Sequence, residues 1–366
     1  MTSSSAVPSG TLIEGRRAPT AVLAGIGAWL PPTIVTNAEL ADRLGVTDEW
    51  IYQRTGIRQR HVVEPGVSTA DLAVEAGARA LDSAGDRTVD AVVVATATPD
   101  HPLPAIAPAV AARLGLAGVA AFDVGAVCAG FVYGLAAGAS LIAGGVAARV
   151  LVIGADAFSS VVRPDDQSTA PLFGDGAGAV VLQPGSPAEP GALNAFDLGS
   201  DGGAADLIRI PGGGSRYRWA GGAATDADRY LTIRGREVFT AAVTHLTASS
   251  RTVLTRLGRT PADVDRFVAH QANARILRAV AHQLDVPADR VVMNIDRVAN
   301  TSAASIPLAL CDAIAQRVLR PGHFVLLTAF GGGLAWGSTA LTWPAMTPAM
   351  TRADTPATTP AVTLAR

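Results

Sequence analysis

Short apolar runs alternate with helix-length segments along most of this chain, and this alternation limits the possible folds more than any other feature. In the run Ala91–Thr96, Ala-Val-Val-Val-Ala-Thr, no polar residue separates the apolar ones. A strand of that kind is covered on both faces, as in a parallel sheet between helices. Similar runs lie at Ala120–Val124, Val150–Ala155 and Ala179–Leu182, and predicted helices lie at Thr69–Ala84, Pro104–Leu114 and Cys128–Ala143.

The alternation begins again after a glycine-rich stretch. The second set comprises a helix over 236–257, strand Val264–Ala269, helix Asn273–Leu284, strand Val291–Asn294, helix Ser302–Val318 and strands Phe324–Ala329 and Ala335–Trp343. This pattern predicts a layered α/β protein with two similar halves, 20–190 and 191–343. We expect a flexible arm at 1–19 and a disordered tail at 344–366, because both lack periodicity and are rich in small residues and proline.

An irregular insertion at Ile210–Asp228 interrupts the second half. It contains the cluster Arg216, Tyr217, Arg218 and Trp219 among glycines. Long irregular loops in compact domains are usually functional, so we predict a binding or lid element here.

The composition excludes several classes of protein. The chain of 366 residues is 49% apolar and only 16% charged, which indicates a large interior. A net charge of −2 argues against a dedicated nucleic-acid binder. All 29 basic residues are arginine, which excludes mechanisms based on a Schiff-base or P-loop lysine. Any docking of an acidic partner must therefore rely on arginine.

The sequence also indicates a compartment. Two cysteines do not make a disulfide framework. Arg16-Arg17 before the apolar run Ala21–Leu30 is superficially similar to a twin-arginine export signal, but glycines interrupt the run and Pro31-Pro32 follows it. We interpret it as a first core strand. No uninterrupted apolar stretch of about 18 residues is present, so we predict a cytoplasmic protein that does not cross a membrane.

Cys128 lies where an apolar strand meets an Ala/Gly-rich helix, in the segment 123–134. The unpaired N–H groups and positive dipole end of a helix favour a thiolate, which is the nucleophilic form. From its local sequence alone, Cys128 could equally be a small core residue. Cys311 lies within a predicted helix, and we interpret it as structural.

Two further polar residues lie at similar junctions in the second half. His270 ends a strand and Asn300 precedes a helix. Alone, the first could be a structural histidine and the second an N-cap. Related halves could bring both to the cysteine and form a nucleophile site. The glycines 331–333 would let backbone N–H groups approach a ligand, or could simply form a hairpin. Glycines in the segment 173–178 precede a strand, so we interpret them as a close-packed turn and not a dinucleotide site.

Together these motifs resemble the β-ketoacyl-acyl carrier protein synthase III family of thiolase-fold condensing enzymes. The likeness covers nearly all of the chain from Ala21 to Trp343. It implies two α/β halves in an αβαβα arrangement. The motifs are Asp48-Glu-Trp-Ile, Arg54-Thr-Gly-Ile-Arg, the Cys128 segment, Phe173-Gly-Asp-Gly-Ala-Gly, Gly235-Arg-Glu-Val-Phe239, His270-Gln-Ala-Asn, Asn300-Thr-Ser-Ala-Ala-Ser-Ile-Pro and Phe330-Gly-Gly-Gly.

The resemblance implies a ping-pong reaction without a metal or redox cofactor. Cys128 would take an acyl group from coenzyme A or a carrier protein, with the backbone N–H groups of Cys128 and Gly332 as oxyanion hole. His270 and Asn300 would then donate hydrogen bonds to a malonyl thioester as it loses carbon dioxide. The expected partners are an acyl-CoA or acyl-ACP donor, malonyl-ACP and a second copy of the chain.

The resemblance also implies binding residues. Trp50 and Arg54 would hold the nucleotide end of coenzyme A, and Asn273 would contact its pantetheine arm. Phe239 belongs to a motif of the same substrate channel. Arg275 and Arg278 are candidates for docking an acidic carrier protein, although a solvated helix face is the simpler explanation for Arg278.

Two positions depart from the family pattern. Gln167 replaces an arginine of the coenzyme A clamp, and Leu103 stands where relatives place an aromatic residue that closes the acyl pocket across the dimer. With the insertion, these changes favour a specialised acyl donor over acetyl. Two alternatives stay open: transfer of the acyl group from Cys128 to an alcohol or amine without decarboxylation, and a non-catalytic partner subunit.

Overall fold

The computed structural model describes residues 19–216 and 225–348. Residues 1–18 of the predicted arm and 349–366 of the predicted tail lie outside the described residues. Residues 344–348 are described and packed against the fold, where Thr347 O accepts a hydrogen bond from Ser83 Oγ (2.7 Å), so the prediction of disorder is wrong for this part of the tail. Tyr217, Arg218 and Trp219 of the insertion also lie outside them, while Arg216 lies at the boundary. Among the described residues, no helix is both long and apolar enough to cross a membrane.

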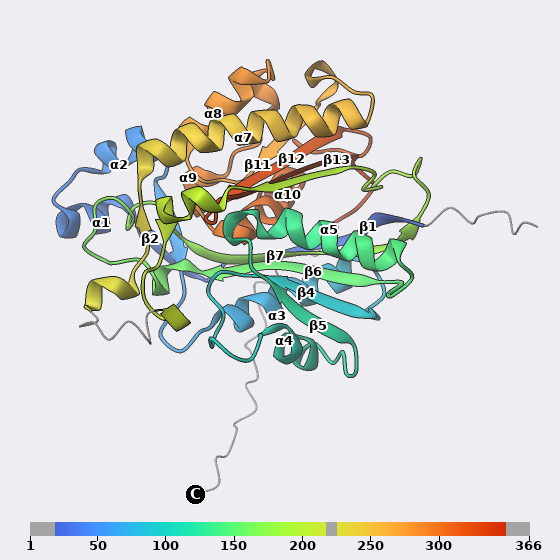
Figure 1. Cartoon of the computed structure of the whole chain (residues 1–366), viewed down its shortest axis with the longest axis horizontal. Coiled ribbons are helices and arrows are strands. Elements are labelled where there is room, and N and C mark those ends of the chain that lie inside the picture. Colours follow the sequence, from blue (N-terminus) through green and yellow to red (C-terminus); the bar gives the residue numbers. More distant parts are fainter. Residues whose placement is uncertain (1–18, 217–224, 349–366) are drawn as a thin grey trace, which may run out of the picture.

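Two sheets form the centre of the molecule (Figure 1). The first has the order β1 (Thr20–Trp29), β7 (Asp175–Gly185), β6 (Val150–Ala157), β4 (Ala91–Ala95) and β5 (Ala120–Val124). The second has the order β11 (Arg266–Ala269), β12 (Phe324–Gly331), β13 (Ala335–Thr342) and β8 (Phe196–Ser200). All strands of the first sheet come from 20–185 and all those of the second from 196–342.

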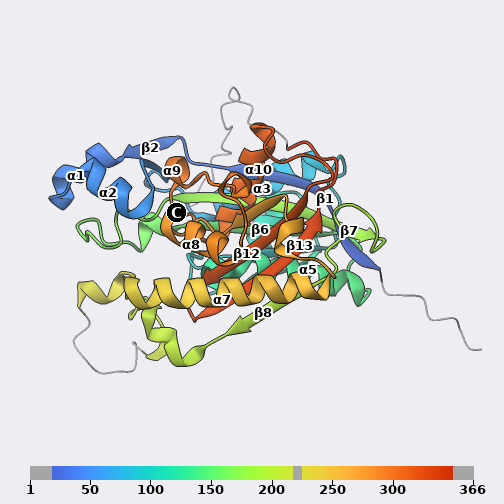
Figure 2. The same cartoon turned by 90° about the horizontal axis from the view of Figure 1, so that it is seen from above.

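Helices complete five layers, which confirms the expected αβαβα arrangement (Figures 1 and 2). Helices α5 (Gly130–Ala143) and α10 (Ser305–Ala315) lie between the sheets and contact both. Helices α3 (Thr69–Ser83) and α4 (Ala107–Arg113) cover the outer face of the first sheet. Helices α7 (Gly235–Arg256) and α8 (Ala274–Gln283) lie on the outer side of the second.

Small residues let the central helix α5 approach its sheet. Gly130, Gly134 and Gly138 recur every four residues, and so lie on one face of the helix. A Cβ atom on each would lie 3.0 Å from a side chain of β4, β6 or β7. Strands β4 and β6 are buried along their whole length, as the continuous apolar runs predict. This packing fixes the N-terminal end of α5, which follows Cys128.

A small lobe follows β1 and consists of β2 (Thr33–Thr36), α1 (Asn37–Leu44), α2 (Asp48–Thr55) and β3 (Gln59–Val62). Thr36 caps α1 in a capping box, and Thr47 accepts a hydrogen bond from the first turn of α2. Both helices end at a glycine with a left-handed backbone, Gly45 and Gly56. This lobe carries Trp50 and Arg54 toward the second half.

Several predicted elements differ in the structure. Val291–Asn294 is not a strand: Val291 makes one isolated bridge to Phe267, and helix α9 (Ile295–Val298) follows. The helices predicted to begin at Cys128 and Ser302 begin with 3₁₀ turns, η1 (Val127–Ala129) and η7 (Ser302–Ala304). The segment 175–178 lies in β7 and not in a turn, although its glycines are tightly packed. The insertion is closed by a short pair, β9 (Ile208–Arg209) and β10 (Thr232–Ile233).

Candidate active site

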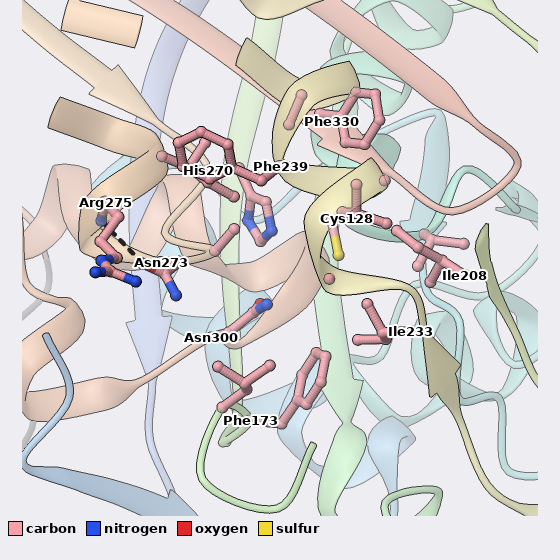
Figure 3. A pocket seen from close by; sticks show the side chains of 18 of the residues that line it. Cys128, Phe173, Ile208, Ile233, Phe239, His270, Asn273, Arg275, Asn300 and Phe330 are labelled. Carbon is pink, nitrogen blue, oxygen red and sulfur yellow. Dashed lines mark hydrogen bonds between the residues drawn. The ribbon is translucent and has the colours of Figure 1, made fainter. Parts of the chain in front are cut away.

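A cavity of about 420 Å³ lies where the two halves meet (Figure 3). Cys128 from the first half and His270 and Asn300 from the second all line it, and Figure 3 shows their side chains directed into it. Its inner wall is apolar and includes Phe158, Phe173, Ile208, Leu231, Ile233 and Phe330. Among residues 19–216 and 225–348, no cluster of His, Cys, Asp or Glu is arranged to hold a metal ion.

Cys128 lies in η1, one residue after Val127, whose φ of 47° is unusual for a β-branched side chain. The cysteine is partly exposed at the cavity wall. The end of β12 passes directly over it: a Cβ atom on Gly331, the last residue of this strand, would lie 2.7 Å from the backbone nitrogen of Cys128. Only glycine allows so close an approach. Gly332, the expected oxyanion-hole residue, follows as the first residue of the loop between β12 and β13 and faces Ile208.

The protonation state of Cys128 differs from the sequence expectation. Burial raises the pKa of the Cys128 thiol to about 12; the Ser302 side chain lowers this pKa and the Asp156 carboxylate raises it, both to a smaller extent than burial. The sequence predicted a thiolate favoured by the helix end. That prediction considered the helix alone, but the cost of removing the sulfur from water is the larger effect. The resting group is therefore a thiol.

His270 follows β11 and is 3% exposed. Its backbone N–H donates to Thr328 O (2.8 Å), and its ring Nδ1 lies 2.6 Å from Ser305 Oγ. Burial lowers the pKa of His270 to about 3, so the ring is neutral near pH 7. Because Nδ1 is bound to Ser305, Nε2 is the nitrogen left for the cavity.

Asn300 is 5% exposed and is held by its backbone, which accepts from Gly174 N (3.0 Å) and donates to Leu172 O (3.0 Å). Its side-chain Oδ1 accepts from Ser302 N (2.9 Å). With the oxygen bound in this way, the amide N–H groups are left to face the cavity (Figure 3). The N-cap of η7 is Thr301, so Asn300 is not the N-cap that its local sequence would suggest.

The outer part of the cavity is basic. Arg54, Arg236 and Arg275 line it together with Phe239, and no acidic residue is part of the described lining. Asn273 also lies there, but both ends of its side chain are already bound: Oδ1 accepts from Arg275 N (2.9 Å) and Nδ2 donates to Arg54 O (3.0 Å). It joins the small lobe to α8, so a pantetheine contact would have to share these atoms.

The remaining predicted residues lie outside this cavity. The Trp50 ring stacks under the Arg54 guanidinium, 4.1 Å from its centre. The exposed Gln167 donates to Leu44 O (2.6 Å) at the end of α1. Arg278 is exposed one turn beyond Arg275 on α8 and lines a separate shallow pocket. Leu103 is 84% exposed.

Sequence reasoning missed Ser305 and the apolar wall. Ser305 was visible in the motif 300–307, but only the fold shows that its hydroxyl meets His270. Phe158 and Phe173 stack with ring centres 4.6 Å apart and come from segments that no local pattern connects. Arg236 lies within the motif 235–239, which by itself indicates no role for this side chain, and only the structure places it in the cavity lining.

A thiol, a neutral imidazole and an amide donor, which face one cavity between stacked α/β halves, define a thiolase-fold condensing enzyme. The family model described as 3-oxoacyl-[acyl-carrier-protein (ACP)] synthase III matches residues 122–202. The model described as the C-terminal part of the same synthase matches residues 254–343. The chain is 59% identical to β-ketoacyl-[acyl-carrier-protein] synthase III 5 of Streptomyces coelicolor over 89% of this chain and 98% of that one. It belongs to the 3-oxoacyl-[acyl-carrier-protein] synthase III family.

Solved structures agree with this assignment. The 3-oxoacyl-(acyl carrier protein) synthase III from Pseudomonas aeruginosa is 51% identical, with a TM-score of 0.84 over 90% of this chain and 100% of that one. The priming β-ketosynthase of a polyketide biosynthetic pathway is 32% identical, also with a TM-score of 0.84, over 92% of this chain and all of that one.

Proposed function

We propose that this chain loads an acyl group onto Cys128 and condenses it with malonyl-ACP, with loss of carbon dioxide, in fatty acid or polyketide biosynthesis. The observation that carries this proposal is the convergence of Cys128, His270 and Asn300 on one cavity. No metal or redox cofactor takes part in the proposed steps. We also expect the enzyme to work in the cytoplasm.

In the loading step, the Cys128 sulfur attacks the acyl thioester while its proton passes to Nε2 of neutral His270. The S–C bond to the carrier breaks, and His270 returns the proton to the departing carrier thiolate. Ser305 supports this because its hydroxyl can accept a hydrogen bond from Nδ1–H when Nε2 is the base. The oxyanion would be held by backbone N–H groups of Cys128 and Gly332.

In the condensing step, His270 and Asn300 act as donors. The Ser305 oxygen accepts a hydrogen bond from Gln271 N (3.3 Å), which leaves the Ser305 hydroxyl proton free to be donated to Nδ1 of His270. When Nδ1 accepts that hydrogen bond, the proton of the neutral imidazole is on Nε2. Nε2–H and the Asn300 amide then stabilise the enolate oxygen as carbon dioxide leaves. The resulting carbanion attacks the acyl carbon, and the Cys128 sulfur departs with the electron pair of the C–S bond.

The lining of the cavity supports an acyl group larger than acetyl. Aromatic and branched aliphatic side chains form the wall of the cavity beside Cys128. Two of them, Phe173 and Leu231, are buried. Such a wall favours apolar acyl groups through the area it removes from water. At the mouth, Arg54 and Arg275 provide charge for the phosphates of coenzyme A or an acidic carrier protein.

The experiment is to supply a panel of acyl thioesters and record the intact mass of the protein, then add malonyl-ACP with a labelled carboxyl group. We expect a mass increase at Cys128 and labelled carbon dioxide on addition of malonyl-ACP. Labelling of Cys128 without carbon dioxide release would overturn condensation in favour of acyl transfer to an alcohol or amine. No mass increase with any donor would overturn the loading step itself.

We further propose a homodimer formed through β5. This strand lies at the edge of the first sheet and pairs with β4 alone among the described strands (Figure 1). The loop after Leu103 is anchored on β5, because Asp123 accepts from Ile106 N and Ala107 N, each at 2.9 Å. A partner paired on this edge would lie beside the exposed Leu103, as expected of a residue that reaches the partner's pocket.

A further inference from the structure

A buried carboxylate, Asp156 of β6, binds the turn that follows Asn300. It is fully buried, and burial raises its pKa to about 6, so the group is an anion near pH 7. Its Oδ2 accepts a hydrogen bond from Ala303 N (3.1 Å) in η7. Its Oδ1 accepts from three groups of the segment after β4: Thr96 Oγ1 (3.1 Å), Ala97 N (2.7 Å) and Thr98 Oγ1 (3.1 Å). One oxygen therefore binds the first half of the molecule, and the other binds the second.

The backbone around Asn300 is strained. Ala299, just before it, has a φ of 59° and a ψ of −159°, a conformation found almost only in glycine. Ser302, two residues after it, has a φ of 51°. Residues of this kind keep their conformation only where the surrounding structure imposes it. The turn that carries Asn300 therefore depends on the contacts that hold it from outside.

Strand β6 provides such a contact to η7. A Cβ atom on Gly154 would collide with Ala303 O, so only glycine lets the turn lie this close to the strand. Asp156, two residues further on and so on the same face of β6, accepts from Ala303 N. The preceding N–H, that of Ser302, donates to Oδ1 of Asn300 (2.9 Å) and leaves the amide N–H groups for the cavity. The position of Ala303 thus determines how the Asn300 amide faces the cavity.

We propose that Asp156 is a positioning residue for the condensing step: it holds Ala303, and through η7 it keeps the Asn300 amide directed at the malonyl thioester. Asp156 transfers no proton and does not line the cavity. The inference rests on the proposed function, because it requires Asn300 to act as a donor in condensation and not in loading. Its consequence is selective: loss of the contact slows decarboxylation and does not slow loading of Cys128.

Asp156→Asn breaks this contact. An amide has one oxygen, and the three donors of 96–98 keep that oxygen at the place of Oδ1, so the NH2 group meets Ala303 N, donor against donor. With malonyl-ACP that carries a labelled carboxyl group, we expect carbon dioxide release to fall about tenfold to a hundredfold, as for a displacement of about 1 Å at a reacting group. Acyl loading, followed by intact mass, should not slow.

Thr96→Val is the matched control, because it removes a donor from the other oxygen of the same carboxylate and leaves the bond to Ala303. It should leave the ratio of decarboxylation to loading unchanged. A loss of carbon dioxide release equal to that of Asp156→Asn would assign the effect to the segment 96–98 and overturn the proposal.

A double-mutant cycle with Asn300→Ala shows whether Asp156 acts through Asn300. If it does, adding Asp156→Asn to Asn300→Ala causes no further loss of carbon dioxide release, because the amide that it positions is already absent. A merely structural role would lower the rate by the same factor in both backgrounds. That result would overturn the proposal, as would equal loss of loading and decarboxylation in Asp156→Asn.

Gly154→Ala tests the same contact without removing the charge. Its Cβ atom would push Ala303 away from β6, so it should reproduce the selective loss of carbon dioxide release. This variant decides if Asp156→Asn does not fold, and unchanged release in folded Gly154→Ala would then overturn the proposal. Absence of carbon dioxide release from the wild type would count against the proposed function alone.

Discussion

At the scale of single residues, the neutral state of His270 would suit one ring to both proposed half-reactions. Burial lowers its pKa to about 3, so the imidazole is uncharged near pH 7. An uncharged ring can accept the thiol proton in loading and donate from Nε2 in condensation. An imidazolium could do only the second.

Asn300→Ala should separate these half-reactions. Its amide is placed to donate to the enolate and has no role in loading, so Cys128 should still accept an acyl group. Carbon dioxide release should fall by about a hundredfold to a thousandfold, as for loss of one transition-state donor. Cys128→Ala is the matched control and should show the reverse, with decarboxylation retained and loading lost. Equal loss of loading and decarboxylation in Asn300→Ala would contradict these roles.

His270 should also make stability depend on pH. Its pKa is about 3 in the folded state and about 6.5 in the unfolded chain. Between these values the unfolded state binds a proton that the folded state does not, so stability present above about pH 6.5 is lost as pH falls. His270→Gln should therefore lose less free energy of unfolding than the wild type between pH 7 and pH 4, measured by urea denaturation. If the free energy of unfolding of the wild type and of the variant fell by the same amount between pH 7 and pH 4, burial would not lower the pKa of His270.

At the scale of elements, the end of α2 joins the small lobe to α8 of the second half. Gly56 has a φ of 78°, and a Cβ atom there would lie 2.5 Å from Ala274 Cβ on α8. Gly56→Ala should therefore add a clash to the cost of a left-handed backbone. We expect a loss of roughly 1–3 kcal/mol beyond the backbone cost, and weaker loading from acyl-CoA because Arg54 moves with α2.

Gly45→Ala is the control for this change. Gly45 ends α1 in the same left-handed conformation, with φ of 63°, but its nearest neighbour would be the Gln167 side chain at 4.0 Å. Only the backbone cost of about 1–2 kcal/mol applies there. Urea denaturation of both variants gives the comparison. Equal losses would mean that the contact between α2 and α8 is not tight.

The sequence predicted the elements whose pattern is strong and missed what depends on distant contacts. Continuous apolar runs located β4 and β6 because a strand buried on both faces needs no alternation. Val291–Asn294 has a similar composition, but only one bridge supports it, and the chain turns into α9. Likewise, the position of Cys128 before a helix was visible, but the desolvation that reverses its expected pKa shift comes from segments far along the chain.

At the scale of the molecule, the site depends on the stacking of the two halves. The first half contributes Cys128 at the start of α5, and the second contributes His270 and Asn300 at the ends of their own segments. Asp156 also links the halves, because its carboxylate accepts from Ala303 N of the second. Neither half alone contains a nucleophile together with the groups that move its proton. The same first sheet ends in β5, so the proposed dimer would extend the layer that positions the cysteine.

Ala121→Pro should separate the dimer into monomers. In β5, Ala120 N donates to Asp90 O (3.1 Å) and Val124 O accepts from Thr96 N (3.4 Å), so the backbone N–H and C=O groups of these two residues point toward β4. The backbone groups of alternate residues point the opposite way, so the N–H of Ala121 points to the free edge. Proline there removes an outward donor without breaking the pairing with β4. Light scattering should give about 37.2 kDa in place of twice that mass. Ala121→Thr, which keeps the N–H, should stay dimeric. A dimeric Ala121→Pro variant would mean that another surface makes the contact.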